Sequence, residues 1–262
     1  AITEAGFGAD LGAEKFLDIK CRQAGLKPDA VVIVATVRAL KMHGGVKKTD
    51  LAVENLDALR KGIENLEKHI ENIHKYHLPS VVAINAFPTD TKAELELLKE
   101  ICKQKGVDVA ISEVWAKGAD GGIELAEKFL EVLDTKEAHF EPLYDLNLPI
   151  ADKIKVIAKE IYGGDDVTFT KKVMNKMKKY EAQGLGQLPI CVAKTQYSLS
   201  DDPTLLGRPH GFVVEINDLI PNTGAGFLVA ISGDIMRMPG LPKQPAAVNM
   251  DIDEDGKIVG LF

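Results

Sequence analysis

Residues 30–45, AVVIVATVRALKMHGG, hold the pattern that decides the fold. The stretch Ala30–Val37 is almost continuously apolar and rich in β-branched side chains, and a Lys27-Pro28-Asp29 turn precedes it. This composition is typical of a strand that is buried on both faces of a parallel sheet. The cations Arg38, Lys41 and His43 follow directly, and the pair Gly44-Gly45 comes after them.

The same order, a short apolar strand and then a helix, occurs three times. The second helix is announced by Thr91 and Glu94, which have the spacing of a capping box. Three such units predict a parallel, doubly wound sheet with right-handed crossovers. Strands are predicted over Ala30–Val37, Ser80–Ile84 and Val107–Ile111, and helices over Leu51–Tyr76, after Thr91, and over Gly122–Leu133.

The remainder of the chain has a different pattern. After the proline-containing segment Glu141–Pro149, long helical periodicity gives way to short apolar runs. We therefore predict an α/β protein in which residues 1–140 form the parallel doubly wound domain and residues 141–262 form a smaller mixed α/β domain. Helices are predicted over Ala151–Tyr162 and Thr168–Gln183, and strands over Ile190–Ala193, Phe212–Ile216 and Phe227–Ile231.

The composition narrows the class of protein. The chain has 262 residues and a formal net charge of −7, which disfavours a general nucleic-acid binder. Its longest apolar run is far shorter than the roughly 18 residues that a membrane span needs. Cys21, Cys102 and Cys191 stand far apart and form no CxxC pair. This spacing favours buried thiols in a reduced, cytoplasmic compartment.

The loops that follow the three strands are the predicted ligand site, because ligands bind at the carboxyl ends of the strands in such sheets. These loops span Arg38–Thr49, Ala86–Thr91 and Glu113–Gly121. In the first loop, Arg38, Lys41 and His43 suit an anionic ligand, since Arg binds phosphate with two donors and Lys binds it as a point charge. A solvated basic turn is the alternative.

Each of the other two loops presents an aromatic side chain. Phe87 stands at a strand end before Pro88, and Trp115 is the only tryptophan of the chain. Two aromatics at adjacent strand ends suit a flat heterocycle, because offset stacking adds about 0.5 to 1.5 kcal/mol beyond burial. The alternative is that both rings are core residues that cover the edge of the sheet.

The glycines of Gly6–Gly12 allow two interpretations. Their GxGxxxG spacing invites comparison with dinucleotide-binding loops, and a nucleotide-dependent oxidoreductase would follow from it. No strand is predicted before them, however, and the spacing is one residue longer than the commonest form. The other interpretation is a tight turn that exposes Phe7 before a helix over Leu11–Ala24.

The C-terminal acidic residues also allow two interpretations. Asp251, Asp253 and Asp255, followed by Gly256, match the first half of a calcium loop. The twelfth position of such a loop is a Glu, but here it is Phe262. A hairpin with a turn at Glu254-Asp255-Gly256 explains the same residues.

The stretch at residues 34–45, VATVRALKMHGG, resembles a signature of the formate–tetrahydrofolate ligase family, also called formyltetrahydrofolate synthetase. The similarity extends from Ala1 to Phe262 and covers roughly the C-terminal half of the family's chains. Other stretches that resemble the family are TEAGFGADLG at 3–12, FPTDT at 87–91, EVWAKG at 113–118, GDIM at 233–236 and MPGLP at 238–242.

The resemblance implies an activity and its substrates. The family makes 10-formyltetrahydrofolate from formate, ATP and tetrahydrofolate, by way of formyl phosphate. It implies Mg-ATP as co-substrate, a monovalent cation such as potassium or ammonium, and a homo-oligomer. By resemblance, Phe7, Phe87 and Trp115 line the folate site, Arg38, Lys41 and His43 lie near the phosphates or the acyl phosphate, and Arg208, His210 and Gly211 lie on the nucleotide side.

One feature of the family is missing from the sequence. The family has a phosphate loop upstream of the stretches quoted above, but no GxxxxGK[ST] motif occurs in this chain, which begins at Ala1. We therefore expect a folate-side half that is inactive as a ligase until an N-terminal half supplies the phosphate loop. The alternative from another class is a non-catalytic folate-binding or assembly module.

Overall fold

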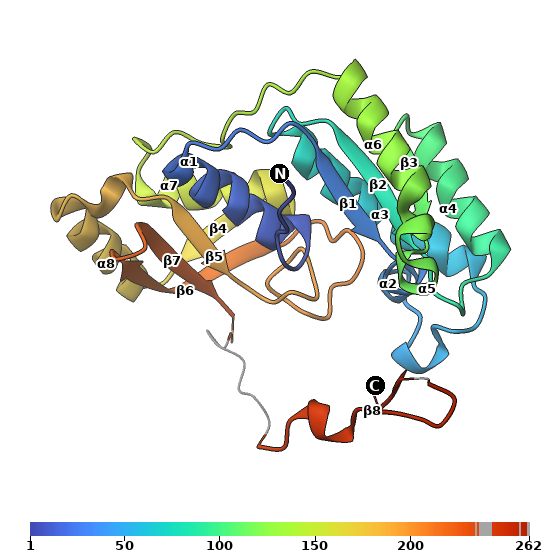
Figure 1. The fold of residues 1–262 in the computed structure, drawn as a ribbon. Coiled ribbons are helices and arrows are strands. Elements are labelled where there is room, and N and C mark those ends of the chain that lie inside the picture. The colour runs from blue at the N-terminus through green and yellow to red at the C-terminus, as the bar shows by residue number, and fades with distance from the viewer. Residues whose placement is uncertain (234, 236–242, 257, 261–262) are drawn as a thin grey trace.

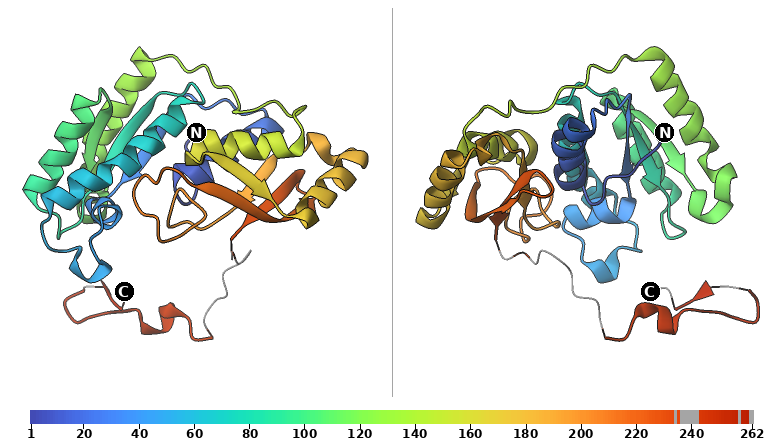
Figure 2. Two further views of the ribbon diagram at one scale, coloured as in Figure 1. Left: turned by 180° about the vertical axis from the view of Figure 1, so that it is seen from behind. Right: turned by 60° about the vertical axis from the view of Figure 1, so that its left-hand side comes forward.

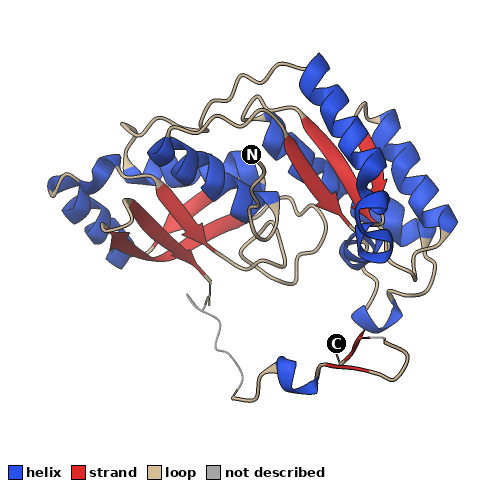
Figure 3. Ribbon diagram, viewed as in Figure 1, coloured by secondary structure: helices blue, strands red, loops and turns tan. Residues whose placement is uncertain are grey.

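The computed structural model describes residues 1–233, 235, 243–256 and 258–260. Two sheets with helices around them form an α/β protein (Figures 1 and 3). The buried apolar side chains of both sheets belong to one continuous core. Because the core is shared, the boundary between residues 1–140 and 141–262 stays a prediction. No helix of the described residues is long and apolar enough to cross a bilayer.

The first sheet is parallel, with the strand order β1-β2-β3. It consists of β1 (Val31–Ala35), β2 (Ser80–Asn85) and β3 (Asp108–Ser112). The connecting helices α3 (Leu56–His74) and α4 (Lys92–Gln104) pack on one face, and α6 (Ile123–Thr135) packs on the other face over β2 and β3 (Figures 1 and 2). The order has no reversal among these strands, so a doubly wound sheet stays a prediction.

The prediction that the first strand is buried on both faces is wrong for β1. Ile33 and Ala35 point into the core against α3, but Val32 and Val34 on the other face are exposed, Val34 to 65%. The cause is the position of α6, which covers β2 and β3 and leaves this face of β1 bare among the described residues. A strand at the edge of a sheet thus has the sequence of a strand buried on both faces.

The strand also ends earlier than predicted, and a helix replaces the predicted first loop. Thr36 caps α2 (Val37–His43), because its hydroxyl accepts a hydrogen bond from the Ala39 N–H at 3.1 Å. Arg38, Lys41 and His43 therefore lie on a helix. In contrast, the capping box of Thr91 and Glu94 at the start of α4 is confirmed, with hydrogen bonds in both directions.

The second sheet is mixed, with the strand order β4-β6-β7-β5. Its strands are β4 (Asp166–Phe169), β5 (Ile190–Ala193), β6 (Val213–Asn222) and β7 (Phe227–Ser232). The helix predicted over Ala151–Tyr162 is confirmed as α7 (Ile150–Val156) with its continuation η5 (Ile157–Tyr162). The helix predicted from Thr168 begins later, as α8 (Lys171–Ala182), because Thr168 belongs to β4.

Both ends of the chain carry short elements. A continuous helix over residues 9–24 packs between the two sheets; it consists of η1 (Ala9–Ala13), η2 (Phe16–Cys21) and α1 (Arg22–Ala24). At the other end, β8 (Asp251–Ile252) and β9 (Ile258–Val259) pair antiparallel and confirm the predicted hairpin. Figures 1 and 2 show this hairpin apart from the two sheets. Phe262, the proposed twelfth calcium position, lies outside the described residues.

The remaining short elements are α5 (Val114–Lys117) after β3, with η4 (Gly118–Gly122) leading into α6, and the short helices η3 (Lys48–Asp50), η6 (Leu185–Gln187) and η7 (Ala246–Asn249). The loop predicted over Glu113–Gly121 is thus largely helical. This turn of helix is what presents Trp115 at the end of the third strand.

Candidate functional site

The carboxyl ends of β1, β2 and β3 bring the predicted site segments to one edge of the first sheet. The Ala86 N–H donates to the Ser112 carbonyl at 3.0 Å, so the segment after β2 is tied to the end of β3. Figure 1 shows α2 and α5 together at this edge. The segments that carry Arg38, Phe87 and Trp115 are therefore neighbours, as predicted from the order of the strands.

Arg38 contacts Phe87 directly. Its guanidinium carbon lies 5.6 Å from the centre of the Phe87 ring, which is cation–π geometry. The Phe87 N–H donates to a carboxylate oxygen of Asp90 at 2.9 Å and thereby tightens the turn that follows β2. One cation from the first strand end and one aromatic from the second thus form a single unit.

Lys41 does not face a ligand, as the predicted anion-binding loop would require. Its side chain is fully buried, and its ammonium group lies 2.7 Å from the Glu94 carboxylate, which is also fully buried. The ammonium group also donates to the Val53 carbonyl at 3.0 Å. Lys41 therefore faces the protein interior, and Arg38 is the cation of α2 that lies against the aromatic ring.

Trp115 is exposed to 73%, so it is not a core residue, and the alternative interpretation fails for this ring. It lies on α5, which a Glu113–Lys117 pair spans on the surface at 2.5 Å. Gly121 packs against the start of this turn, where a Cβ atom would lie 2.4 Å from the Glu113 carbonyl. Phe87, in contrast, is half-buried.

Phe7 is exposed to 79% and has a φ of 62°, an uncommon conformation for a bulky residue. The turn packs closely on itself, since a Cβ atom on Gly12 would lie 1.7 Å from the Gly6 carbonyl oxygen. Residues 1–8 contain no strand. The structure therefore supports the turn that exposes Phe7 and lacks the strand that a dinucleotide loop requires.

The anchor of this turn is an ion pair that sequence reasoning missed. Lys194, after β5, lies 2.9 Å from Asp10, and both side chains are almost completely buried. The partners are 184 positions apart along the chain. Asp10 lies in the stretch at 3–12, but nothing in either local sequence indicates that Lys194 is its partner. The pair forms because the second sheet packs against the N-terminal helix, and no local sequence pattern indicates this packing.

His43 is held as a neutral imidazole. Its Nδ1 accepts a hydrogen bond from the Gly207 N–H at 3.1 Å, which leaves the ring proton on Nε2. Burial lowers the pKa of His43, the nearby His69 lowers it further, and Asp10 opposes both. His43 can thus donate one hydrogen bond but does not supply a fixed positive charge.

Arg208 follows Gly207, which contacts His43 at the end of α2, but its guanidinium lies against Glu71 on α3. Its guanidinium forms two hydrogen bonds of 2.7 Å with the Glu71 carboxylate, which neutralise its charge. Glu71 lies 16 residues after Asn55, the cap of α3, so about 24 Å of helix separates it from the edge where α3 begins. His210 and Gly211 are exposed in the same loop.

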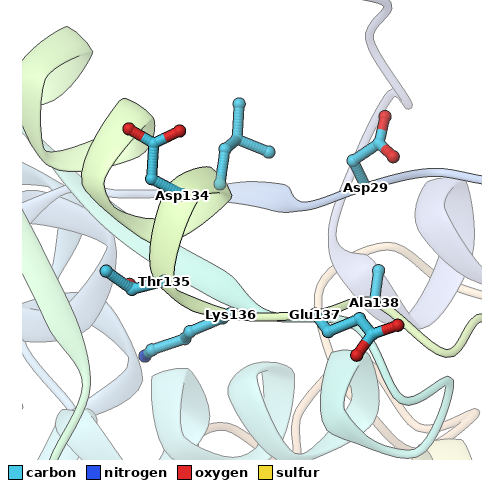
Figure 4. Close-up of a pocket in the computed structure, with 7 residues that line it drawn as sticks. Asp29, Asp134, Thr135, Lys136, Glu137 and Ala138 are labelled. Carbon is cyan, nitrogen blue, oxygen red and sulfur yellow. The ribbon is translucent and has the colours of Figure 1, made fainter.

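Two hollows border the first sheet. One of about 400 Å³ lies between Asp29, before β1, and residues 133–138 at the end of α6, which places it at the opposite edge (Figure 4). The other, of about 510 Å³, is bordered by residues 45–47 and 53–55 and by Asp50. It lies beside the Lys41–Glu94 pair, because Val53 and Asn55 are hydrogen-bonded to that pair.

Metal ligands do not gather anywhere in the described residues. No group of three or more His, Cys, Asp or Glu side chains among them is placed to hold an ion. At the strand edge, the described residues include the exposed Trp115 ring, the Arg38 guanidinium against Phe87, and the His43 imidazole at the end of α2.

A cation and an aromatic side chain in contact at the strand ends of a parallel α/β sheet are typical of the class of proteins that bind flat, anionic ligands. The family comparison agrees with this class. A family model described as formate–tetrahydrofolate ligase matches residues 1–262. The match spans the whole chain, so the chain belongs to the formate–tetrahydrofolate ligase family.

Proposed function

We propose that this chain forms the folate side of an active site that produces 10-formyltetrahydrofolate from formate, ATP and tetrahydrofolate. The observation that carries the proposal is the Arg38–Phe87 unit, which lies at the same strand edge as the exposed Trp115, in a chain that belongs to the family throughout its length. Family membership implies the ligase activity or a close relation to it.

The aromatic residues are the proposed folate contacts. Phe87 and Trp115 hold the pterin ring between them, and Phe7 adds a third aromatic surface. The exposure of Trp115 and Phe7 supports this role, because it leaves both ring faces accessible for stacking with a ligand. The strained φ of Phe7 supports it as well, since strain of this kind gathers at functional sites.

The polar residues act on the charge that moves during the reaction. A formate oxygen attacks the γ-phosphorus and ADP leaves; the folate N10 then attacks the formyl carbon and phosphate leaves. Arg38 stabilises the charge on the transferring groups, and His43 donates its Nε2–H to one of their oxygens. Arg208, His210 and Gly211 remain nucleotide-side proposals, although Glu71 engages Arg208.

Mg-ATP is held mainly by a segment that this sequence does not contain. The family uses ATP, and no phosphate loop motif occurs in the sequence. The described residues also form no acidic cluster for Mg²⁺. We propose that the chain corresponds to the C-terminal half of the enzyme and that an N-terminal half supplies the phosphate loop.

The edge of the first sheet supports a second half. The described strands leave one side of β1 unpaired, and Val32 and Val34 present an apolar surface beside it. Such an edge favours the addition of a further strand and of a helix that covers the two valines. A homo-oligomeric, cytoplasmic enzyme remains the expectation for the complete assembly.

The test begins with binding. Trp115 is the only tryptophan, so its fluorescence reports directly on folate stacking. We expect quenching by tetrahydrofolate, no ATP-dependent product from the 262-residue chain alone, and turnover after addition of the N-terminal half. Turnover by the chain alone would contradict the division into halves, and no quenching would contradict the folate site.

The same experiment addresses the non-catalytic alternative. That alternative is favoured by one observation, the missing phosphate loop motif. Folate binding without turnover in the presence of the N-terminal half would support a binding or assembly module. Detectable NAD binding would instead support the oxidoreductase, for which the required strand before Gly6 is missing.

A further inference from the structure

The fully buried Lys41–Glu94 pair connects three segments of the strand edge. One Glu94 oxygen accepts from the Lys41 ammonium at 2.7 Å and from the Asn55 N–H at 3.0 Å. The other oxygen accepts from the Thr91 N–H at 3.1 Å. A single carboxylate thereby joins α2, the segment before α3, and the first residue after the Phe87 turn.

The hydrogen bonds of Glu94 oppose the effect of its burial. Burial raises the pKa of this carboxyl group, but the bonds from Lys41, Thr91 and Asn55 outweigh it, so that the pKa lies below the ordinary value. Glu94 is therefore charged inside the protein. A buried charge of this kind is tolerated only when its partners hold a definite geometry, and this geometry restricts how the three segments lie relative to each other.

The pair acts on the Arg38–Phe87 unit from both sides. Arg38 precedes Lys41 by three residues on α2, so the anchoring of Lys41 sets the position of the guanidinium group. The Phe87 turn ends at Thr91, whose backbone Glu94 holds, and Asp90 closes the turn. Both members of the stack are thus tied to the same buried carboxylate.

We propose that Lys41 and Glu94 are positioning residues that hold Phe87 and Arg38 in the orientation that binds the folate ring. The proposal rests on the folate site proposed above. Lys41, which the sequence suggested as a phosphate ligand, thus binds the buried Glu94 carboxylate instead. An apolar pair of the same size would fill the space but would supply no directional bonds to Asn55 and Thr91.

A double-mutant cycle between Lys41→Met and Phe87→Leu tests the proposal. The dissociation constant of tetrahydrofolate is measured on the 262-residue chain from Trp115 fluorescence. We expect Lys41→Met to weaken binding about tenfold, the size of one lost aromatic stack. In the Phe87→Leu background, Lys41→Met has less than about a twofold effect, because residues that act through one hydrogen-bond network are coupled.

Equal factors in both backgrounds would overturn the proposal, since a merely structural role of Lys41 lowers affinity whether or not Phe87 is present. Unchanged affinity in the folded Lys41→Met variant would overturn it too. Both outcomes leave the folate site intact, because the wild-type chain still binds. No binding by the wild-type chain would instead overturn the proposed function, and the positioning role with it.

Three further variants complete the design. Lys41→Arg keeps a buried charge that donates to Glu94 and is expected to retain more affinity than Lys41→Met. Lys99→Met removes the partly exposed Lys99–Glu124 pair, which joins α4 to α6, and is expected to bind like the wild type. If Lys41→Met does not fold, Glu94→Gln takes its place in the cycle with Phe87→Leu. The same changes in tetrahydrofolate affinity are then expected.

Discussion

Glu94 and Glu14 are both completely buried, but their surroundings differ. Glu94, under the Phe87 turn, accepts three hydrogen bonds, one of them from a buried ammonium group. Glu14, in the N-terminal helix, has only a 3.5 Å contact from the Lys15 ammonium, and its Oε1 has no partner among the described residues. The pKa of Glu94 is accordingly lowered, whereas burial raises the pKa of Glu14 to about 8.

The difference teaches that burial alone does not decide the charge of a carboxyl group. The charge also depends on how many hydrogen-bond donors face the carboxyl group, because each donor replaces part of the lost hydration. The Phe87 region thus contains a charged carboxylate that organises three segments. The helix region contains a carboxyl group that is largely protonated at neutral pH and contributes less to order.

The largest expected effect is the loss of the charged pair. Lys41→Met leaves the Glu94 carboxylate buried without its cation, and we expect a stability loss of about 3 to 5 kcal/mol. Urea unfolding followed by circular dichroism measures it. A loss below about 1 kcal/mol would mean that the two buried glutamates do not differ as described.

A smaller effect of opposite sign is expected from Glu14→Gln. The folded-state pKa of Glu14 is raised, so between pH 4.5 and 8 the native state binds more protons than the unfolded state. Wild-type stability therefore falls as the pH rises through this window. Glu14→Gln removes this slope and gains about 2 to 4 kcal/mol over the wild type between pH 5 and pH 8.

Unfolding curves of both proteins at pH 5, 6, 7 and 8 provide the measurement. The stability difference should grow steadily with pH, because only the wild type loses a proton-linked contribution. Parallel profiles for wild type and variant would show that Glu14 is hydrated in solution and that its contrast with Glu94 is smaller than proposed.

The exposed ring of the site provides a third comparison, since we propose that it binds ligand without supporting the fold. Trp115→Ala is expected to weaken tetrahydrofolate binding by about 1 to 3 kcal/mol. Stability should stay within about 0.5 kcal/mol of the wild type, because the ring is mostly exposed. Calorimetric titration replaces fluorescence here, and unchanged affinity in the folded variant would remove Trp115 from the folate site.

The smallest effect is expected for a Lys–Glu pair of the same chemistry at the surface. Glu113 and Lys117 lie 2.5 Å apart on α5, but both are about half exposed. Lys117→Met should change stability by less than about 1 kcal/mol, since water screens the pair. Urea unfolding beside Lys41→Met gives the contrast, and a loss of similar size in both variants would show that burial is not what distinguishes the pairs.

Much of the fold could be predicted from the sequence because its signals are local. The three strand-helix units follow from apolar periodicity, and the start of α4 follows from the hydroxyl and carboxylate of its capping box. The placement of Phe87 and Trp115 at one edge needs only the rule that parallel strands end on the same side. The family match over the chain agrees with the motifs at these positions.

The errors have a common physical cause, which is dependence on distant neighbours. The exposure of Val34 depends on where α6 lies, and α6 follows β1 by almost 90 residues. The burial of Lys41 depends on Glu94, and the anchor of Asp10 depends on Lys194. Nothing within a window of a few residues distinguishes a lysine that faces a ligand from one that faces a buried carboxylate.

By itself, the sequence determined the α/β class, the succession of strand-helix units along the chain, the aromatic residues at the strand ends and the family. Each of these depends on residue types at short spacing, which local backbone geometry converts directly into structure. Only the tertiary structure decided which charges are buried, which cation stacks on Phe87 and which edge of the sheet is bare. Those properties arise from segments packed together across long separations, where the surrounding donors set the charge and the covering helices set the exposure.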